Sequence, residues 1–409
     1  MNLLNISVKN ASFHFDKIFL KTPNKILFNL YLLFLGSLRL KRLKNLKYNK
    51  VLLLGSPPDS GLGFVVRSFF DLLKLHIKTQ IIYLRAIENQ KIKKSLKNTI
   101  NIFIGNPYNL HAANSLLGKD YLLNNYNVGL WFWELETIPW QWHINKNWID
   151  EIWVQSDFIF NTLKKINPKI YKIPFVVSPK PNERKNRSFF QLPEKKFIFL
   201  FAFDFWSYYE RKNPEAIIRA FKKAFPSRKD VYLVIKTTHG NERLQDKEKL
   251  ISIIKGNENI QLRDTLLSDE DYFSLLNQCD CYISLHRSEG LGLTMAEAMA
   301  LGKPVIATNY SGNLEFMKDD NSCLVSYKLI PVSNYVSYSS RSKWADPDDE
   351  SAAYFMRKIV HNKEFRKRIS SKAASDMKSF SNKNMKKEIL KRIDAINKQS
   401  SINDQEPCI

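Results

Sequence analysis

The chain has 409 residues, of which 44% are hydrophobic and 25% charged, and its formal net charge is +23. This length exceeds what one ordinary core accommodates and predicts two domains. The balance of apolar and charged residues is that of a soluble globular protein. The positive surplus attracts anions, which leaves nucleic acid, anionic lipid headgroups and phosphorylated substrates as candidate partners.

The first 48 residues differ in composition from the rest of the chain. Residues 1–50 hold ten Lys and Arg against one Asp. The longest apolar run, 26–35, is shorter than the roughly 20 residues that cross a bilayer, and cations come after it at Arg39, Lys41, Arg42, Lys44 and Lys47. This pattern favours a helix in the membrane interface; the alternative is a helix that packs on the fold. No signal peptide is evident.

The four cysteines, Cys279, Cys281, Cys323 and Cys408, show neither metal-binding spacing nor a dense disulfide framework. Cys279 and Cys281 are predicted on one face of a strand. We expect buried, reduced thiols and a reducing compartment.

The first half reads as alternating strands and helices. An apolar strand at 51–55 enters a Pro/Ser/Gly loop at 56–63 and a helix at 64–75. Further strands are predicted at 80–84, 100–104, 128–133 and 151–155. Such alternation predicts a parallel α/β sheet.

A polar stretch at 178–188 has no apolar periodicity and predicts a linker. The alternation then restarts, with strands at 197–203, 231–236, 260–262, 281–285 and 304–308 and helices at 213–225, 269–278 and 294–301. A basic helical region occupies 364–397. The predicted domains are a basic extension (1–48), an N-terminal domain (49–185), a C-terminal domain (186–380) and a basic helix and tail (381–409). Both domains are expected to be doubly wound and Rossmann-like, facing each other across a ligand cleft.

The segment 284–302 carries the strongest chemical signal. Gly290 and Gly292 allow backbone N–H groups to approach a ligand, and the N-terminus of the next helix favours a phosphate. Glu289 in the loop and Glu297 in the helix offer carboxylates to sugar and ribose hydroxyls. Glu289 is part of no local structural motif, so a ligand role and no structural role is expected for it.

For Glu297 a structural alternative exists. Thr294 and Glu297 match the T-x-x-E capping box, in which the glutamate only satisfies N–H groups at the start of a helix. The sequence leaves both interpretations of Glu297 open.

Glu289 and Glu297, separated by seven residues that include Gly290 and Gly292, resemble the E-x7-E motif of retaining glycosyltransferases of family 4, which have the GT-B fold. The segments 302–308 and 311–313 resemble the strand and loop that come after this motif in the family. The resemblance implies that Glu289 touches the transferred hexose and Glu297 the ribose. The donor-binding segment that it implies consists of Ser288, Glu289, Gly290, Leu291, Gly292, Leu293 and Glu297.

Cations after two other strands fit a departing diphosphate. Lys212 matches the phosphate-binding lysine of the family, and Lys236 is a second candidate. Many relatives carry an arginine about six residues before this lysine, whereas here Arg211 lies next to Lys212. For each cation the alternative is a solvated surface charge.

In the first half, Gly61 and Gly63 resemble the glycine loop that borders the donor phosphate and the acceptor in the family. Many relatives have a histidine where Glu134 stands. Glu134 or Glu136 is therefore expected to orient the acceptor or the hexose; the alternative is that this aromatic-rich segment, 131–139, serves core packing.

The resemblance implies a retaining, metal-independent transfer in which the leaving diphosphate takes the acceptor's proton, with a nucleotide sugar as substrate and no further cofactor. Two D-x-D strings are not expected to bind metal. Asp269 and Asp271 open a helix, and Asp346 and Asp348 are placed in a Pro-containing loop rather than at a strand end. His286 is expected to be structural or to line the cleft.

The expected partners are a nucleotide-sugar donor, a glycan or glycolipid acceptor and an anionic membrane surface, at the inner face of the membrane in the cytoplasm. Nucleic acid is not expected, because no recognised binding module accompanies the charge. The remaining alternatives are a nucleic-acid-binding protein and a catalytically inactive GT-B binding module.

Overall fold

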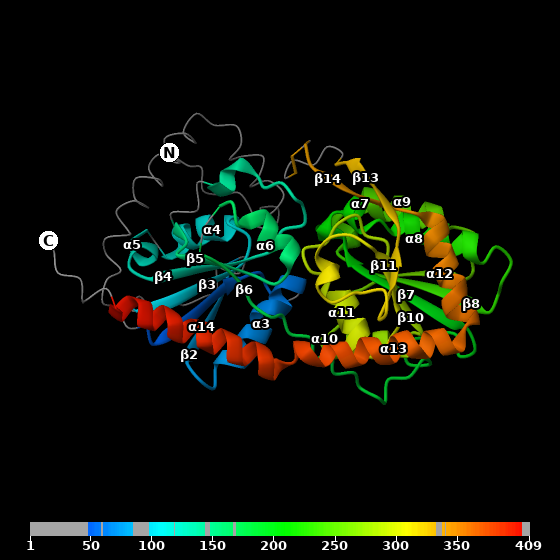
Figure 1. The fold of residues 1–409 in the computed structure, drawn as a ribbon. Helices are drawn as coiled ribbons and strands as arrows, with labels where there is room; N and C mark the ends of the chain where they lie inside the picture. Colours follow the sequence, from blue (N-terminus) through cyan, green and yellow to red (C-terminus); the bar gives the residue numbers. More distant parts are fainter. Residues whose placement is uncertain are drawn as a thin grey trace. The chain divides into compact units, whose positions relative to one another are not determined.

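The computed structural model describes residues 48–58, 60–84, 98–117, 119–143, 148–166, 169–332, 338–339 and 341–402. The chain divides into two compact units (Figure 1). The first comprises Met1–Pro174, Val332–Ser342 and Met385–Ile409, and the second Phe175–Pro331 and Lys343–Asn384.

The polar stretch at 178–188, expected to be a linker, lies inside the second unit. It is fixed there by polar contacts to one helix. The Asn182 N–H donates to Ser274 Oγ at 2.8 Å, and Lys185 pairs with Asp271 at 2.6 Å. The absence of apolar periodicity in this stretch therefore reflects a surface segment held by side-chain hydrogen bonds rather than a free connection.

The first unit is built on a six-stranded parallel sheet in the order β2-β1-β3-β4-β5-β6. Its inner strands are apolar and buried, as expected of a parallel sheet with both faces covered. The strands are β1 (Lys50–Gly55), β2 (Lys78–Tyr83), β3 (Thr99–Gly105), β4 (Tyr126–Trp131), β5 (Glu151–Val154) and β6 (Ile170–Lys172). Each predicted strand is present, and β6 was not predicted.

The helices of the first unit alternate with the strands. They are α3 (Gly61–Leu73), α4 (Tyr108–Leu117), α5 (Lys119–Leu123), η3 (Trp140–His143), α6 (Asp157–Leu163) and most of α14 (Asn382–Ile402). A buried ion pair holds α14 to the sheet: Arg392 contacts both carboxylate oxygens of Glu151, which also accepts from Trp153 Nε1 at 2.6 Å.

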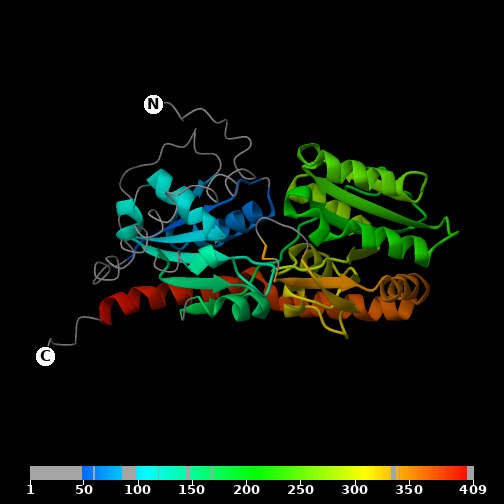
Figure 2. The same ribbon diagram turned by 90° about the horizontal axis from the view of Figure 1, so that it is seen from above.

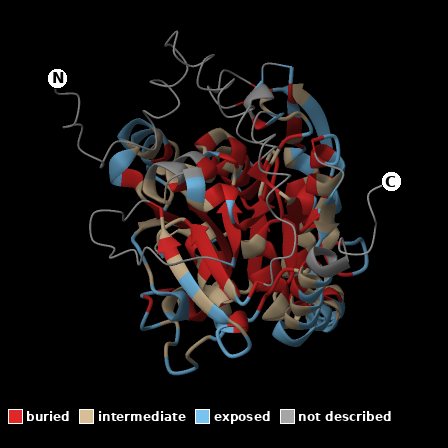
Figure 3. Ribbon diagram, turned by 90° about the vertical axis from the view of Figure 1, so that its left-hand side faces the viewer, coloured by how far each residue is buried: buried red, intermediate tan, exposed pale blue. Residues whose placement is uncertain are grey.

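The second unit has a six-stranded parallel sheet in the order β12-β11-β10-β7-β8-β9. Its strands are β7 (Phe197–Asp204), β8 (Val231–Thr238), β9 (Ile260–Asp264), β10 (Cys281–Ser284), β11 (Val305–Thr308) and β12 (Cys323–Val325). Buried residues concentrate in the inner strands of both sheets, and buried residues are coloured red in Figure 3.

A two-stranded antiparallel ribbon, β13 (Tyr327–Pro331) and β14 (Lys343–Pro347), also belongs to the second unit. The ribbon was not predicted from the sequence, and the expected placement of Asp346 in a loop was wrong. Asp346 lies in β14, and Asp348 comes directly after the strand as the N-cap of α12. The error arose because a Pro next to two Asp reads as a turn, whereas this Pro ends an edge strand, where no N–H is needed.

Helices cover both faces of the second sheet (Figure 2). Successive residues of β7 lie on opposite faces of the sheet. Phe199 packs with α8 and α12, whereas Leu200 packs with α10, α11 and α13. The longer helices are α8 (Pro214–Ala224), α9 (Leu244–Ile254), α10 (Asp269–Gln278), α11 (Leu293–Ala300), α12 (Asp349–His361) and α13 (Lys363–Met377). The short ones are η5 (Phe205–Ser207), α7 (Tyr209–Lys212), η6 (Gly240–Glu242), η7 (Gly312–Glu315) and η8 (Lys378–Phe380).

Cys279, Cys281 and Cys323 are buried free thiols, as predicted, although Cys279 caps α10 and only Cys281 lies in β10. Burial raises the pKa of Cys279 to about 12. Within the described part of the chain, no helix combines the length and the hydropathy that crossing a bilayer requires. The helix expected near 26–47 lies outside the described residues.

Candidate functional site

The predicted donor residues meet at the point where the second sheet reverses its strand order. From β7 the chain winds outward through β8 and β9, then returns to β10 on the other side of β7. In such sheets ligands bind beyond the carboxyl ends of the strands at this switch point. Arg211 and Lys212 come after β7, and Glu289 comes after β10, so all three lie there.

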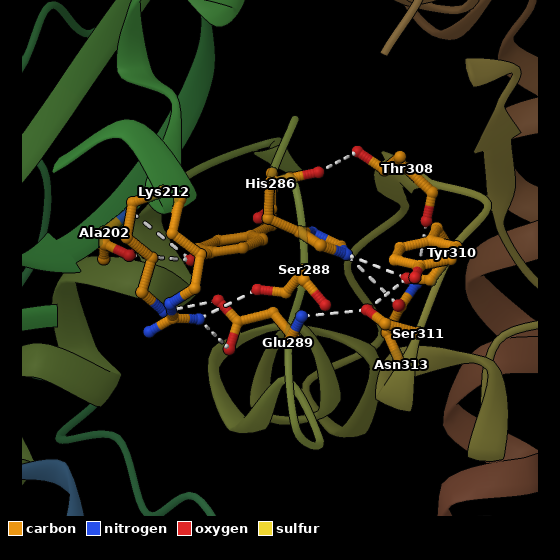
Figure 4. A network of polar contacts seen from close by, with 12 residues as sticks. Ala202, Lys212, His286, Ser288, Glu289, Thr308, Tyr310, Ser311 and Asn313 are labelled. Atoms are coloured by element: carbon orange, nitrogen blue, oxygen red, sulfur yellow. Dashed lines mark hydrogen bonds and ion pairs between the residues drawn. The ribbon is translucent and has the colours of Figure 1, made fainter. Parts of the chain in front are cut away.

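Glu289 is held between two cations. Its Oε1 lies 2.5 Å from Lys212 Nζ, and its Oε2 lies 3.1 Å from Arg211 Nη1 (Figure 4). Arg211 Nη1 also donates to the carbonyl of Ser288 at 2.9 Å. Glu289 and Arg211 are 8% and 4% exposed, so the group is a buried, charge-compensated cluster with one cation in excess.

The charges decide the ionisation of Glu289. Burial, the largest single effect, acts to raise the pKa of this carboxyl, but Lys212 and then Arg211 outweigh it and lower the pKa to about 2. Glu289 is therefore an anion at neutral pH. The expectation that Glu289 has no structural role was wrong, because its carboxylate compensates the buried guanidinium of Arg211. Sequence spacing could not reveal partners 77 and 78 residues away, Lys212 and Arg211.

A second layer fixes the backbone behind Glu289 (Figure 4). The Glu289 N–H donates to Ser311 Oγ at 2.8 Å, and its carbonyl accepts from the Gly312 N–H at 2.9 Å. His286 is fully buried, with its ring nitrogens 3.1 Å from Ser284 Oγ and 3.2 Å from Asn313 Oδ1. His286 is thus structural, one of its two predicted roles, and burial lowers its pKa.

Backbone strain gathers around this cluster. Among the described residues, six other than glycine have positive φ, and Tyr208, Asn213, His239 and Ser311 are four of them. Tyr208 and Asn213 flank α7, and Ser311 carries the hydroxyl behind Glu289. Such conformations persist where the surrounding structure enforces them, typically at functional sites.

Glu297 lies in α11 but does not cap it. The N-cap is Gly292, with φ of 91° and no side-chain cap hydrogen bond, so the capping-box interpretation was wrong. The carboxyl is 7% exposed, and its Oε2 has no hydrogen-bond partner among the described residues. Burial raises the pKa of Glu297 to about 8, although Tyr272 acts to lower it. At neutral pH this is a protonated acid.

The loop around Glu289 is buried. Ser288 and Leu291 are 0% and 3% exposed, Gly290 is also buried and Leu293 opens α11. Position 292 favours glycine for two reasons. Its φ is positive, and a Cβ there would lie 2.4 Å from Met295 Cε. Gly292 therefore shapes the turn that comes before the first residue of α11.

Lys236 is a further buried cation at this edge of the sheet. It lies in β8, which continues two residues beyond it, and it is 8% exposed. Burial lowers the pKa of Lys236 to about 8, although Asp204 and Asp264 act to raise it. Lys236 Nζ lies 6.0 Å from the ring centroid of Tyr272, the residue that also faces Glu297. Lys236 is therefore not a solvated surface charge.

The carboxylates of the two D-x-D strings have other partners. Asp271 accepts from Lys185, and Asp346 accepts from Arg287 Nη2 at 3.3 Å. Asp348 accepts from the Ser351 N–H at 2.7 Å as an N-cap. Among the described residues, no group of three His, Cys, Asp or Glu side chains is arranged to hold a metal ion.

In the first unit, Gly61 and Gly63 form the first turn of α3, soon after β1. Ser60 caps this helix by accepting from the Gly63 N–H at 3.0 Å. Gly63 is required by packing, since a Cβ there would lie 1.9 Å from the Pro57 carbonyl oxygen, whereas Gly61 faces open space. The N-terminus of α3 thus lies at the switch point of the first sheet, between β1 and β3, and packing requires one of its two glycines.

Glu134 and Glu136 lie beyond β4, which ends at Trp131. Glu134 is partly buried, and Glu136 is exposed. The aromatic residues beside them form a packed cluster: Trp142 is fully buried, and its ring contacts those of Trp131 and Trp133 at 5.6 and 4.7 Å. Core packing therefore accounts for the tryptophans, and the two glutamates are the polar groups at its edge.

Three residues of the second unit that lie beside Glu297 or α7 were not predicted from the sequence. Tyr272 of α10 faces Glu297, and Arg287 and Trp344 pack against each other beside α7. Only Arg287 carried a signal, as a polar residue two positions before Glu289 and close to the end of a buried strand. Tyr272 and Trp344 are distant in sequence, so periodicity alone gave no reason to connect them with the site.

The chain is similar in sequence to known glycosyltransferases. Residues 182–376 match the family described as glycosyl transferases group 1. An uncharacterized glycosyltransferase of Methanocaldococcus jannaschii is 27% identical over 233 residues, which are 52% of this chain and 54% of that protein. The chain thus spans about half the length of the curated relative that it matches.

Solved structures resemble the fold. Sucrose-phosphate synthase of Thermosynechococcus elongatus has a TM-score of 0.64 at 13% identity, and the match covers 85% of this chain and 99% of that one. Anabaena HepE with UDP and glucose has a TM-score of 0.62 at 13% identity, covering 85% and 100%. The pneumococcal O-GlcNAc transferase GtfA with UDP and GlcNAc has 0.54 at 15%, covering 76% and 59%. The two α/β units with parallel sheets therefore have the GT-B fold of these glycosyltransferases, and residues 182–376 carry the group 1 sequence pattern.

Proposed function

We propose that the protein is a glycosyltransferase of family 4 that moves a hexose from a nucleotide sugar to a glycan or glycolipid acceptor with retention of configuration. The observation that carries this proposal is the Arg211–Glu289–Lys212 cluster, buried at the switch point of the second sheet. An anionic carboxylate suits hydrogen-bond donation by sugar hydroxyls, and the excess cation suits a diphosphate.

The two glutamates have opposite protonation, which supports distinct roles. Glu289, ionised, accepts hydrogen bonds from the hexose; Glu297, protonated at neutral pH, has an unpartnered oxygen for a ribose hydroxyl. The buried N-terminus of α11 and Lys236 add positive potential for the phosphates. Glu134, Gly61 and Gly63 are assigned to the acceptor side in the first unit.

The chemistry proposed for these groups needs no metal ion. Lys212 and Lys236 neutralise the leaving diphosphate, and its oxygen takes the proton of the acceptor hydroxyl as the new glycosidic bond forms. The solved relatives support a nucleotide donor, since HepE was crystallised with UDP and glucose and GtfA with UDP and GlcNAc. The base and sugar that this chain uses are left to experiment.

The test is nucleotide release from UDP-, GDP-, dTDP- and ADP-linked sugars, with crude glycolipid as acceptor. We expect release from one donor and a loss of roughly 100-fold or more in Glu289→Gln, because the negative charge that faces the transferring sugar is removed. Glu350→Gln, an exposed glutamate paired with Lys223 in the same unit, is the matched control and should turn over normally.

Chelator should leave the rate unchanged, and the anomeric signal of the product reports retention. No release from any donor would favour an inactive binding module.

The proposed location is the cytoplasmic face of a membrane, with residues 1–48 as the contact. This rests on the composition of that segment, ten cations against one anion within residues 1–50. Such a surface attracts anionic lipid headgroups, and it would bring the donor site to a glycolipid acceptor.

A further inference from the structure

One arginine joins the two elements that carry the charged cluster. The backbone N–H of Arg287 donates to the Arg211 carbonyl at 2.8 Å, and its own carbonyl accepts from the Ala345 N–H at 2.9 Å. The Arg287 peptide thus lies between α7 and β14, two residues before Glu289. Both partners belong to the second unit, and α7, β13 and β14 are labelled in Figure 1.

The side chain of Arg287 also joins α7 to β14. Its Nη1 donates to the Glu210 carbonyl in α7 at 3.2 Å, and its Nη2 contacts Asp346 Oδ1 in β14 at 3.3 Å. The guanidinium carbon lies 5.5 Å from the ring centroid of Trp344, which is 1% exposed. Only a planar, multi-donor cation can bind a carbonyl and a carboxylate while lying over an aromatic ring.

These contacts fix a distance on which the proposed chemistry depends. Glu210 is two residues before Lys212, and Arg287 is two residues before Glu289, so the four residues form parallel connections between the same two segments. The Lys212–Glu289 contact is 2.5 Å long. Any separation of α7 from the loop after β10 would lengthen it.

We propose that Arg287 is a positioning residue, and that the β13–β14 ribbon, through Trp344 and Asp346, serves to hold it. The clamp formed by Arg287, Trp344 and Asp346 keeps α7 against the Glu289 loop, so that Lys212, Arg211 and Glu289 stand in the arrangement that binds the donor. The effect of the clamp on catalysis rests on the proposed glycosyl transfer, whereas its effect on the structure does not.

Hydrogen exchange tests the structural part without any substrate. In Arg287→Ala we expect faster amide exchange in 209–213 and 287–292, with the strands of the same unit unchanged. Arg228→Ala is the matched control, because Arg228 also pairs with an aspartate, Asp230, and it comes before the start of β8, at the opposite end of that strand from the site. Unchanged exchange in both segments of Arg287→Ala would overturn the clamp.

Kinetics test the catalytic part with the donor found in the release panel. We expect a kcat loss of roughly 10- to 100-fold in Arg287→Ala, because small displacements of catalytic groups are costly, with KM for the donor changed little. Arg287→Lys should recover only part of kcat, since one point charge cannot make both contacts. A large rise in KM with normal exchange would make Arg287 a direct donor ligand and refute positioning.

A second variant and the exchange measurement keep the clamp testable apart from folding and from activity. If Arg287→Ala does not fold, Asp346→Ala removes one contact of the clamp and should show a smaller change of the same kind; wild-type exchange and kcat in Asp346→Ala would then count against the clamp. If the wild type releases no nucleotide, the proposed function fails, and the exchange result alone still confirms or refutes the clamp.

Discussion

At the scale of single residues, the function depends on how each carboxyl is surrounded. Glu289 and Glu297 have the same chemistry and lie eight positions apart, yet the pKa of Glu289 is lowered to about 2 and that of Glu297 is raised to about 8. Two cations compensate the burial of Glu289, whereas at Glu297, which faces Tyr272, the effect of burial dominates.

The partners of Glu289 predict a difference between its two simplest variants. Glu289→Ala leaves the buried Arg211 guanidinium without its carboxylate, and breaking a buried pair from one side costs about 3–5 kcal/mol. Glu289→Gln keeps an acceptor oxygen, so it should lose activity with a smaller loss of stability. Urea unfolding checks this, with Glu350→Gln as reference. Equal midpoints for Glu289→Ala and the wild type would show that the pair does not stabilise the loop.

The raised pKa of Glu297 predicts an unusual pH dependence of stability. Between its ordinary value of 4.5 and about 8, the folded state keeps a proton that the unfolded state has released. Stability therefore falls as pH rises through this window, by up to about 1.4 kcal/mol per pH unit. Glu289 has the opposite sign: its pKa is lowered from 4.5 to about 2, so its contribution is lost as pH falls through that range.

Glu297→Gln tests this, because the amide cannot ionise. Unfolding midpoints at pH 5, 6.5 and 8 should decline less with pH in this variant than in the wild type, and the two proteins should differ most at pH 8. Glu350→Gln, which alters an exposed carboxylate, should keep the wild-type slope. An unaltered slope in Glu297→Gln would assign the decline to another group.

At the scale of elements, the two glycines at the start of α3 differ although the sequence presents them as a pair. A Cβ at Gly63 would lie 1.9 Å from the Pro57 carbonyl oxygen, and a Cβ at Gly61 meets nothing within 4 Å. Gly63 therefore lets the chain pass close to the helix, whereas Gly61 leaves room at its N-terminus.

The pair predicts opposite effects of the same substitution. Gly63→Ala should destabilise the protein by about 1–3 kcal/mol, since the loop must move. Gly61→Ala should be neutral or stabilising by up to about 1 kcal/mol, because it restricts the unfolded chain. Thermal unfolding distinguishes them. A rise in acceptor KM for Gly61→Ala at full stability would support the acceptor-side assignment of this loop, and an unchanged KM would argue against it.

At the scale of the whole molecule, the net charge of +23 is distributed unevenly, with a surplus of nine (ten cations less one anion) in residues 1–50. A chain lacking residues 1–48 should therefore lose binding to phosphatidylserine-containing vesicles at physiological salt, where only clustered charges retain appreciable attraction. Co-sedimentation measures this, with phosphatidylcholine vesicles as the neutral control. Equal binding of both chains to the anionic vesicles would contradict the membrane role of the segment.

Local pattern was sufficient for much of this protein. Apolar runs such as 51–55 and 197–203 predicted buried parallel strands, because a strand covered on both faces has to be apolar along its length. The alternation of strands and helices predicted two α/β units, and the spacing of Glu289 and Glu297 singled out the two carboxyls of the proposed donor site. These features are encoded within a few neighbouring residues, so the sequence alone determined them.

Only the tertiary structure decided what those residues touch. The ion pairs of Glu289 with Arg211 and Lys212, the burial that keeps Glu297 protonated and the contact of Arg287 with β14 each join segments far apart in the chain. The capping box at Thr294 and the loop at Asp346 were plausible locally, and tertiary context overruled both. Contacts of this kind depend on three-dimensional packing, which periodicity and spacing do not record.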